Sequence, residues 1–199
     1  MVDVEGLASE MLESVEMGCP VHPWTMAARA GYVVRVGPAR YPAMTLGPTI
    51  VVPDHRDERR AFAVLHELAH ATLRNAGLPD PETTVDLVAS AALLPRAAFL
   101  RDVERTGGNL HALKRLHPHA SYEAIARRLV AVCGGAVTVH DVGPRGHRSR
   151  TAGAPRRLGA LARSLVLEAH HGGEVVGPDE ARAYPIKDGA WSRVVLVTR

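Results

Sequence analysis

The sequence predicts an α+β fold, with helices packed on a small antiparallel sheet and a small α/β appendage at the C-terminal end. Three observations support this prediction. A β-branched run at Thr49–Pro53 precedes an apolar pattern of helical spacing that continues to Leu73. A second helical pattern covers residues 82–94. Strand-like runs and one further helical pattern then return late in the chain, at residues 136–139, 158–169, 183–186 and 193–197.

The first long helix is expected to begin beside Asp54 or Asp57, because either residue suits the N-cap position. Gly77 and Pro79 provide a stop signal at its other end. The expected core stripe of this helix consists of apolar residues at helical spacing: Phe62, Leu65, Ala69 and Leu73.

The second helix is expected between Pro81, at its N-terminal edge, and Pro95, just past its end. Its apolar residues suit packing against the first helix, since they repeat at helical spacing: Val85, Val88, Ala89, Ala92 and Leu93.

Within the first helix, residues 66–70 read His-Glu-Leu-Ala-His, which is the HExxH pattern. Residues four apart lie on one helical face, so His66 and His70 can both place a ring nitrogen about 2.0–2.1 Å from one Zn²⁺. Glu67 then projects toward the water that the metal polarises. The alternative is that both histidines are ordinary polar residues of an amphipathic helix.

A catalytic zinc ion needs three protein ligands and an open position, so a third donor must come from elsewhere in the chain. Glu82 is the best candidate, because it opens the second helix. Asp86 lies one turn later on the same face and suits a supporting role, accepting a hydrogen bond from the outward nitrogen of a ligand histidine. Alternatively, Glu82 is a first-turn acid favoured by the helix dipole and Asp86 is a surface charge.

Residues 57–95 resemble the ImmA/IrrE family of zinc metallopeptidases. Members typically carry a segment of the form E-x-E-A-N/D-x-F-A-A-x-L-L-M-P after the HExxH helix, and Glu82, Asp86 and Pro95 fall in register with it. The sequence departs from this form at Thr84, Val85, Val88 and Leu94. A weaker resemblance extends over residues 20–132.

These assignments predict a peptidase that binds one Zn²⁺ per chain through His66, His70 and Glu82, with Glu67 as general base. An extended substrate could pair with Thr49–Pro53, if that strand is an exposed edge. The resemblance implies a narrow substrate, a DNA-binding transcriptional repressor of the helix-turn-helix type, cleaved in a regulatory or stress response. Two alternatives stay open: a non-catalytic zinc-containing module that contacts a transcription factor or DNA, and a toxin–antitoxin or phage-derived partner protein.

Stabilisation of the oxyanion has no clear donor in the sequence. His117, His119 and Tyr122 are candidates, since zinc peptidases often use a histidine or tyrosine for this role. The simpler interpretation places both histidines as polar residues in a loop, because Pro118 separates them and Ser121 signals the start of a helix.

The basic residues are concentrated late in the chain. Residues 1–136 hold 14 Lys or Arg and 15 Asp or Glu, whereas residues 137–199 hold 10 and 6. We therefore expect a metallopeptidase-like domain over 1–136 and the appendage over 137–199, with an exposed basic linker containing Gly and Pro at about 142–155. Contact of this linker with DNA is possible but less favoured than a solvated loop.

Composition is typical of a globular enzyme domain. No stretch approaches the 18 or so apolar residues of a membrane helix, and residues 1–16 are acidic rather than basic, unlike a signal peptide. Two cysteines are too few for a disulfide framework. We expect a cytoplasmic protein without membrane contact.

Overall fold

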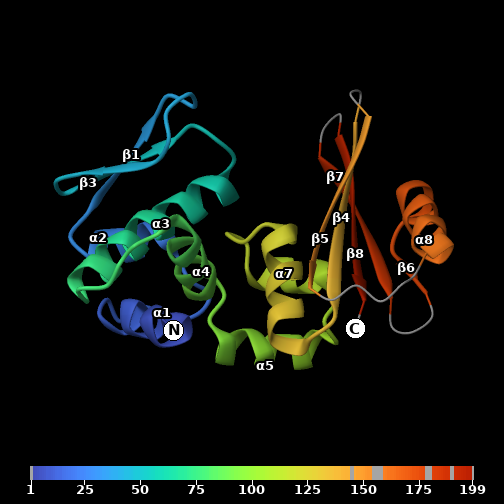
Figure 1. Ribbon diagram of the computed structural model, residues 1–199, viewed down its shortest axis with the longest axis horizontal. Coiled ribbons are helices and arrows are strands. Elements are labelled where there is room, and N and C mark those ends of the chain that lie inside the picture. The colour runs from blue at the N-terminus through green and yellow to red at the C-terminus, as the bar shows by residue number, and fades with distance from the viewer. Residues whose placement is uncertain (1, 144–145, 154–158, 178–180, 189–190, 199) are drawn as a thin grey trace. The chain divides into compact units, whose positions relative to one another are not determined.

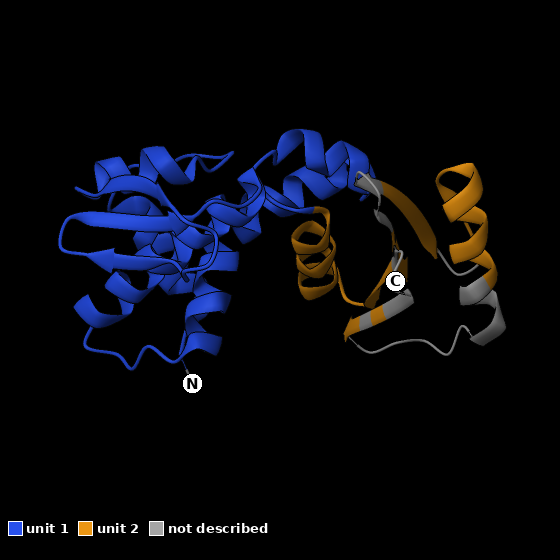
Figure 2. Ribbon diagram, turned by 90° about the horizontal axis from the view of Figure 1, so that it is seen from above, with its two compact units in different colours: residues 1–121 blue, residues 122–199 orange. Residues whose placement is uncertain are grey.

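The computed structural model describes residues 2–143, 146–153, 159–177, 181–188 and 191–198. The chain divides into two compact units, residues 1–121 and residues 122–199, which Figure 2 shows in different colours. The fold is α+β, as the sequence predicts. The domain boundary that we expected after residue 136 stays a prediction; the compact units divide earlier because the helix that opens the second unit packs on the sheet of that unit.

The first unit contains a three-stranded sheet of order β1-β3-β2. β1 (Val33–Gly37) runs parallel to β3 (Thr49–Pro53), and β2 (Met44–Leu46) runs antiparallel to it. The sheet is therefore mixed rather than purely antiparallel. β3 is its central strand, which leaves β1 and β2 as the two edges.

Alternation along β3 decides which face of this sheet is buried. Ile50 and Val52 are fully buried, while Thr49, Val51 and Pro53 are partly exposed. β3 packs against α3 (Asp57–Asn75), which crosses one face of the sheet in Figure 1. Successive side chains of a strand point to opposite faces, so Ile50 and Val52 face this helix and Val51 faces away.

α3 is the central helix of the first unit. It packs against β3, α1 (Val4–Glu13), α2 (Pro23–Arg29) and α4 (Glu82–Leu93). Leu65, Ala69 and Leu73 are fully buried, as the sequence predicts. Phe62 is not: it is half-buried, and its ring centroid lies 6.3 Å from that of His66.

The ends of α3 and α4 follow the sequence closely but not in every detail. The N-cap of α3 is Arg56, with no side-chain cap, so the prediction of an aspartate cap is wrong; Asp57 is instead the first helical residue. Gly77 adopts a φ of 66°, which suits glycine after a helix end. α4 begins at Glu82 after Pro81, as expected, and buries the predicted apolar face.

Two further helices complete the first unit. α5 (Arg96–Thr106) and α6 (Leu110–Leu116) pack against each other. Among the described residues no single helix is long and apolar enough to cross a membrane, although α4 and α5, separated by a bend of 53°, would meet the length and composition criteria together.

The second unit is a five-stranded antiparallel sheet with a helix on each face. α7 (Tyr122–Cys133) packs against β4 (Ala136–Gly143) and β8 (Trp191–Thr198), whereas α8 (Gly159–Gly172) packs against β8 and β7 (Arg182–Asp188) (Figure 1). The strand order is β5-β4-β8-β7-β6, with β6 at Val175–Val176. On the α8 side the buried residues include Leu165, Val166, Ala169, Val194 and Leu196.

The prediction of a basic linker at about 142–155 is wrong for the residues that the structure describes there. β5 (Gly146–Gly153) pairs with β4 along its whole length, from Gly143 opposite Gly146 to Ala136 opposite Gly153. Backbone pairing with a neighbouring strand outweighs the turn-like composition of this segment. Residues 144–145 and 154–155 lie outside the described residues.

The alternation of β3 predicts that Ile50→Ala lowers the free energy of unfolding of the first unit by about 3 kcal/mol, because it leaves a cavity against α3. Val51→Ala, one residue later on the opposite face, should cost about 1 kcal/mol or less. Urea titrations followed by tryptophan fluorescence measure both losses in free energy of unfolding. A Trp191→Phe background is used, so that Trp24 is the only tryptophan left in the sequence. Equal losses for the two variants would contradict the assignment of the faces.

Candidate metal and catalytic site

His66 and His70 lie on one face of α3, one turn apart. Their ring centroids are 4.9 Å apart, and both side chains are largely buried, with exposed fractions of 17% and 14%. α3 holds them there because its apolar residues are buried against β3 and α4. The orientation of the two rings therefore depends on the packing of the whole helix.

Glu82 brings a carboxylate to the same two rings from the start of α4. Its Oε2 lies 3.1 Å from His66 Nε2, and its Oε1 lies 3.6 Å from His70 Nε2. One ligand atom from each of the three residues lies within 4.8 Å of the others. The Glu82 side chain is 74% exposed, so the group is open to solvent at Glu82.

The outward nitrogen of each histidine is held by its own carboxylate. His66 Nδ1 donates to Asp86 Oδ1 at 2.9 Å, and His70 Nδ1 donates to Asp80 Oδ2 at 2.9 Å. A carboxylate only accepts hydrogen bonds, so each neutral ring carries its proton on Nδ1 and presents the lone pair of Nε2 to the group. Two such imidazoles and one carboxylate are a donor set that fits Zn²⁺.

Asp80 is a site residue that the sequence analysis missed. Its Oδ2 also accepts a hydrogen bond from Arg74 Nε at 2.7 Å. The hydrogen bond from His70 and the nearby Arg74 guanidinium hold the pKa of this carboxyl below its ordinary value. The available signal was its position two residues before Glu82, between two prolines that restrict the backbone.

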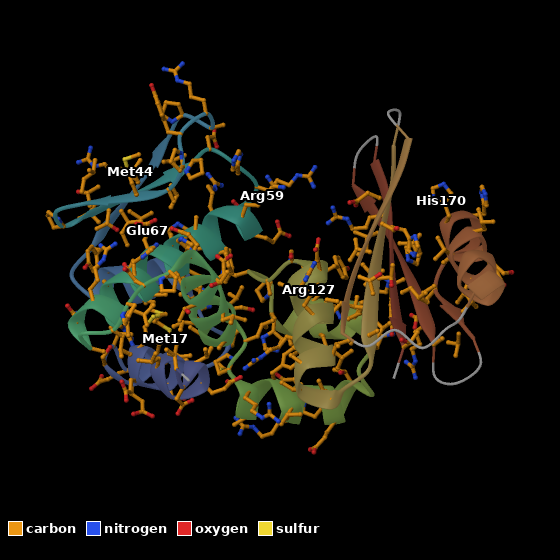
Figure 3. All side chains as sticks on the ribbon, in the orientation of Figure 1. Met17, Met44, Arg59, Glu67, Arg127 and His170 are labelled. Atoms are coloured by element: carbon orange, nitrogen blue, oxygen red, sulfur yellow. The ribbon has the colours of Figure 1, made fainter. Side chains whose placement is uncertain are left out.

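Glu67 points from α3 toward the three-stranded sheet. Figure 3 labels Glu67 and, on the sheet, Met44. It is 9% exposed, and its Oε2 accepts a hydrogen bond of 2.7 Å from Thr45 Oγ1. Thr45 is the middle residue of β2, a strand too short for the sequence pattern to indicate. A buried acid next to a metal-type donor set thus has a defined orientation.

The edge of the sheet beside Glu67 is β2, not β3. We expected an extended substrate to pair with Thr49–Pro53 if that strand were exposed, but β3 lies between β1 and β2, with partners on both sides. Its backbone groups are therefore engaged. Among the described strands β2 pairs with β3 alone, so its other edge is free, and Thr45 connects it directly to Glu67.

The structure does not bring His117 into the group of metal-type donors. It is 4% exposed at the end of α6, with its ring centroid 5.5 Å from that of Phe99. Its Nε2 lies 3.1 Å from Asp102 Oδ2 but outside hydrogen-bonding geometry. Burial lowers the pKa of His117, and Asp102 opposes this shift.

His119 and Tyr122 also have surroundings of their own. His119 Nε2 lies 3.1 Å from His22 Nδ1, and its ring packs against that of Trp24. Burial, followed by the neighbouring His22, lowers the pKa of His119. Tyr122 is the first residue of α7, in the second unit. The oxyanion role of these three residues stays a prediction.

Comparison with known proteins gives one family match and one structural likeness. Residues 35–130 match a peptidase-family model described as the IrrE N-terminal-like domain. A comparison with curated proteins finds no match. A solved structure described as a Mycobacterium tuberculosis transcriptional regulator is similar in fold, with a TM-score of 0.66 and 17% identity over 98% of this chain and 75% of that one. This likeness extends beyond residue 130.

The site geometry predicts two grades of metal loss. Glu82→Ala should abolish stoichiometric zinc binding, whereas Asp86→Ala and Asp80→Ala should each weaken the affinity by about 10–100-fold, since they support a ligand without touching the metal. Competition with a chromophoric chelator measures these affinities.

A matched control for this series is Asp102→Ala, which removes the carboxylate beside His117, outside the group. It should leave zinc affinity unchanged. If Glu82→Ala keeps full affinity while Asp86→Ala or Asp80→Ala loses the metal, the assignment of ligand and support is reversed.

Proposed function

The chain belongs, through residues 35–130, to the ImmA/IrrE family of peptidases, and from this we propose that it is a zinc-dependent endopeptidase that makes site-specific cuts in a regulatory protein. The observation that carries the proposal is the convergence of His66, His70 and Glu82 beside the buried Glu67. We further propose that the protein acts in the cytoplasm, where a transcriptional regulator would be cut.

His66 Nε2, His70 Nε2 and one Glu82 oxygen are the atoms that would hold the zinc ion. When bound, Zn²⁺ supplies a Lewis acid that polarises a carbonyl and lowers the pKa of water toward neutrality. Asp86 and Asp80 keep both rings in the tautomer that this binding requires. The exposed side of Glu82 is the side from which a substrate would approach.

Glu67 is the proposed general base. It takes a proton from the water that attacks the peptide carbonyl and passes that proton to the leaving amine. Thr45 supports this role because its hydroxyl donates to one carboxylate oxygen and so fixes the side chain, leaving the second oxygen for the water. A zinc site with a purely structural role would need no acid in this position, which disfavours the alternative of a non-catalytic binding module.

The substrate is proposed to lie in extended form along the free edge of β2. Backbone pairing with a sheet edge holds a peptide without regard to its sequence, and the Thr45 contact places this edge next to Glu67. Because β2 has only three residues, this pairing would involve a short extended segment of the substrate.

A DNA-binding repressor of the helix-turn-helix type is the substrate class that we propose. The family resemblance supports this choice, and the similar solved structure is itself described as a transcriptional regulator. A partner role in a toxin–antitoxin or phage-derived system is the alternative without catalysis. Cleavage assays separate the two.

Glu67→Gln should keep its zinc and its fold but lose peptide-bond cleavage, because the amide fills the same space and cannot accept the proton of the water. The expected loss in kcat is at least about 100-fold. Zinc content and circular dichroism are the controls. Cleavage of a validated substrate at the wild-type rate by this variant would sink the mechanism.

Selectivity is tested by comparing two classes of substrate. The zinc-loaded protein should leave casein intact while cutting one or two bonds of a helix-turn-helix repressor from the same genome, as the family resemblance of residues 35–130 implies. Mass spectrometry of the products identifies the bonds. Rapid, sequence-indifferent degradation of casein would refute the narrow-substrate proposal even if every zinc ligand proved correct.

A further inference from the structure

The face of the three-stranded sheet that points away from α3 carries exposed and partly exposed apolar side chains beside Arg35, which is opposite Val51. Val33 and Leu46 are 56% and 60% exposed, and Met44 and Val51 are partly exposed. We call Val33, Met44, Leu46 and Val51 the outer face. Among the described elements, α3 packs on β3 from the other side, where Ile50 and Val52 are buried.

The strand register places these side chains in two rows. Leu46 and Val33 are both opposite Thr49, and Met44 is opposite Val51. Residues paired across strands share a face of the sheet, so Met44 and Leu46 lie on the outer face together with Val51. Thr45, between them in β2, is opposite the buried Ile50 and reaches Glu67 on the inner face.

β2 is a short edge strand without the charged or proline residues that discourage pairing at a sheet edge. Its three residues, Met44, Thr45 and Leu46, include no charge and no proline. Natural edge strands usually carry such residues, because a bare edge recruits other strands. An uncharged edge whose central residue contacts the candidate base is therefore suited to receiving a short peptide strand.

A peptide added to β2 would alternate its side chains between the two faces. The residue opposite Thr45 would point inward, toward Glu67 and the histidines, and its two neighbours would point outward, beside Met44 and Leu46. Cross-strand neighbours on one face lie about 4.5–5.5 Å apart, within van der Waals reach of each other.

We propose that Met44 and Leu46 determine substrate specificity, by selecting extended segments with apolar side chains at two positions separated by one residue. This inference rests on the proposed function, since it names the segment that the same site would accept. Side chains of the bound segment would then contact Met44 and Leu46, the part of the outer face that borders the added strand.

Binding rather than cleavage tests this proposal. A library of random ten-residue peptides is selected on the zinc-loaded Glu67→Gln protein, and the retained peptides are sequenced. We expect enrichment of apolar residues at two positions, i and i+2. Introducing Leu46→Glu into the same protein should replace one of these apolar preferences by Lys or Arg, because a carboxylate then faces that position.

Leu167→Glu is the matched control, since Leu167 on α8 is 59% exposed, almost the same as Leu46, and lies in the second unit. It should leave the selected peptides unchanged. Leu46→Ala, which introduces no charge, should weaken the binding of a selected peptide by up to about tenfold in fluorescence anisotropy.

The outcomes separate this inference from the proposed function. Retention of peptides without an i, i+2 apolar preference, no retention at all, or the same preference after Leu46→Glu would each overturn it, even if a repressor is cleaved. Conversely, an apolar preference that Leu46→Glu changes to Lys or Arg supports the inference even if no cleavage is found. In that case only the catalytic proposal fails.

Discussion

Burial of the apolar stripe of α3 is the constraint on which the rest of the first unit depends. Leu65, Ala69 and Leu73 are fully buried, and the helix packs against β3, α2, α1 and α4. With its rotation fixed in this way, the helix has to present His66 and His70 on one face and Glu67 toward β2. A small rotation of α3 would expose apolar surface and disturb all three side chains together.

Carboxylates then fix the orientation of the two histidine rings that the packing of α3 brings together. Each histidine has one carboxylate on Nδ1 and Glu82 near Nε2, so the two rings are held from both sides. Asp86 shares α4 with Glu82, whereas Asp80 precedes that helix and also binds Arg74 of α3. Placement of the donor set therefore depends on the α3–α4 pair as a unit, including the short connection between the two helices.

Besides the contact between α3 and α4, the site depends on a contact between α3 and the three-stranded sheet. The hydrogen bond from Thr45 to Glu67 joins the candidate base to an edge strand, so the orientation of the acid and the position of a docked peptide depend on the same residue. Strand alternation does the rest, because it sends Met44 and Leu46 to the exposed face when Thr45 points inward. Three successive residues of β2 would thus orient the candidate base and select the substrate.

What the sequence alone determined was local. The spacing of HExxH, the core stripe of α3 and the register of Glu82 and Asp86 follow from 3.6 residues per turn, and the late strands follow from β-branched runs. What the tertiary structure decided was which segments meet. Thr45 lies 22 positions before Glu67 and Asp80 lies 10 after His70 in sequence, β3 became a central strand, and the expected linker became β5. Strand order and cross-chain hydrogen bonds arise from packing between distant segments, for which a single sequence carries no periodic signal.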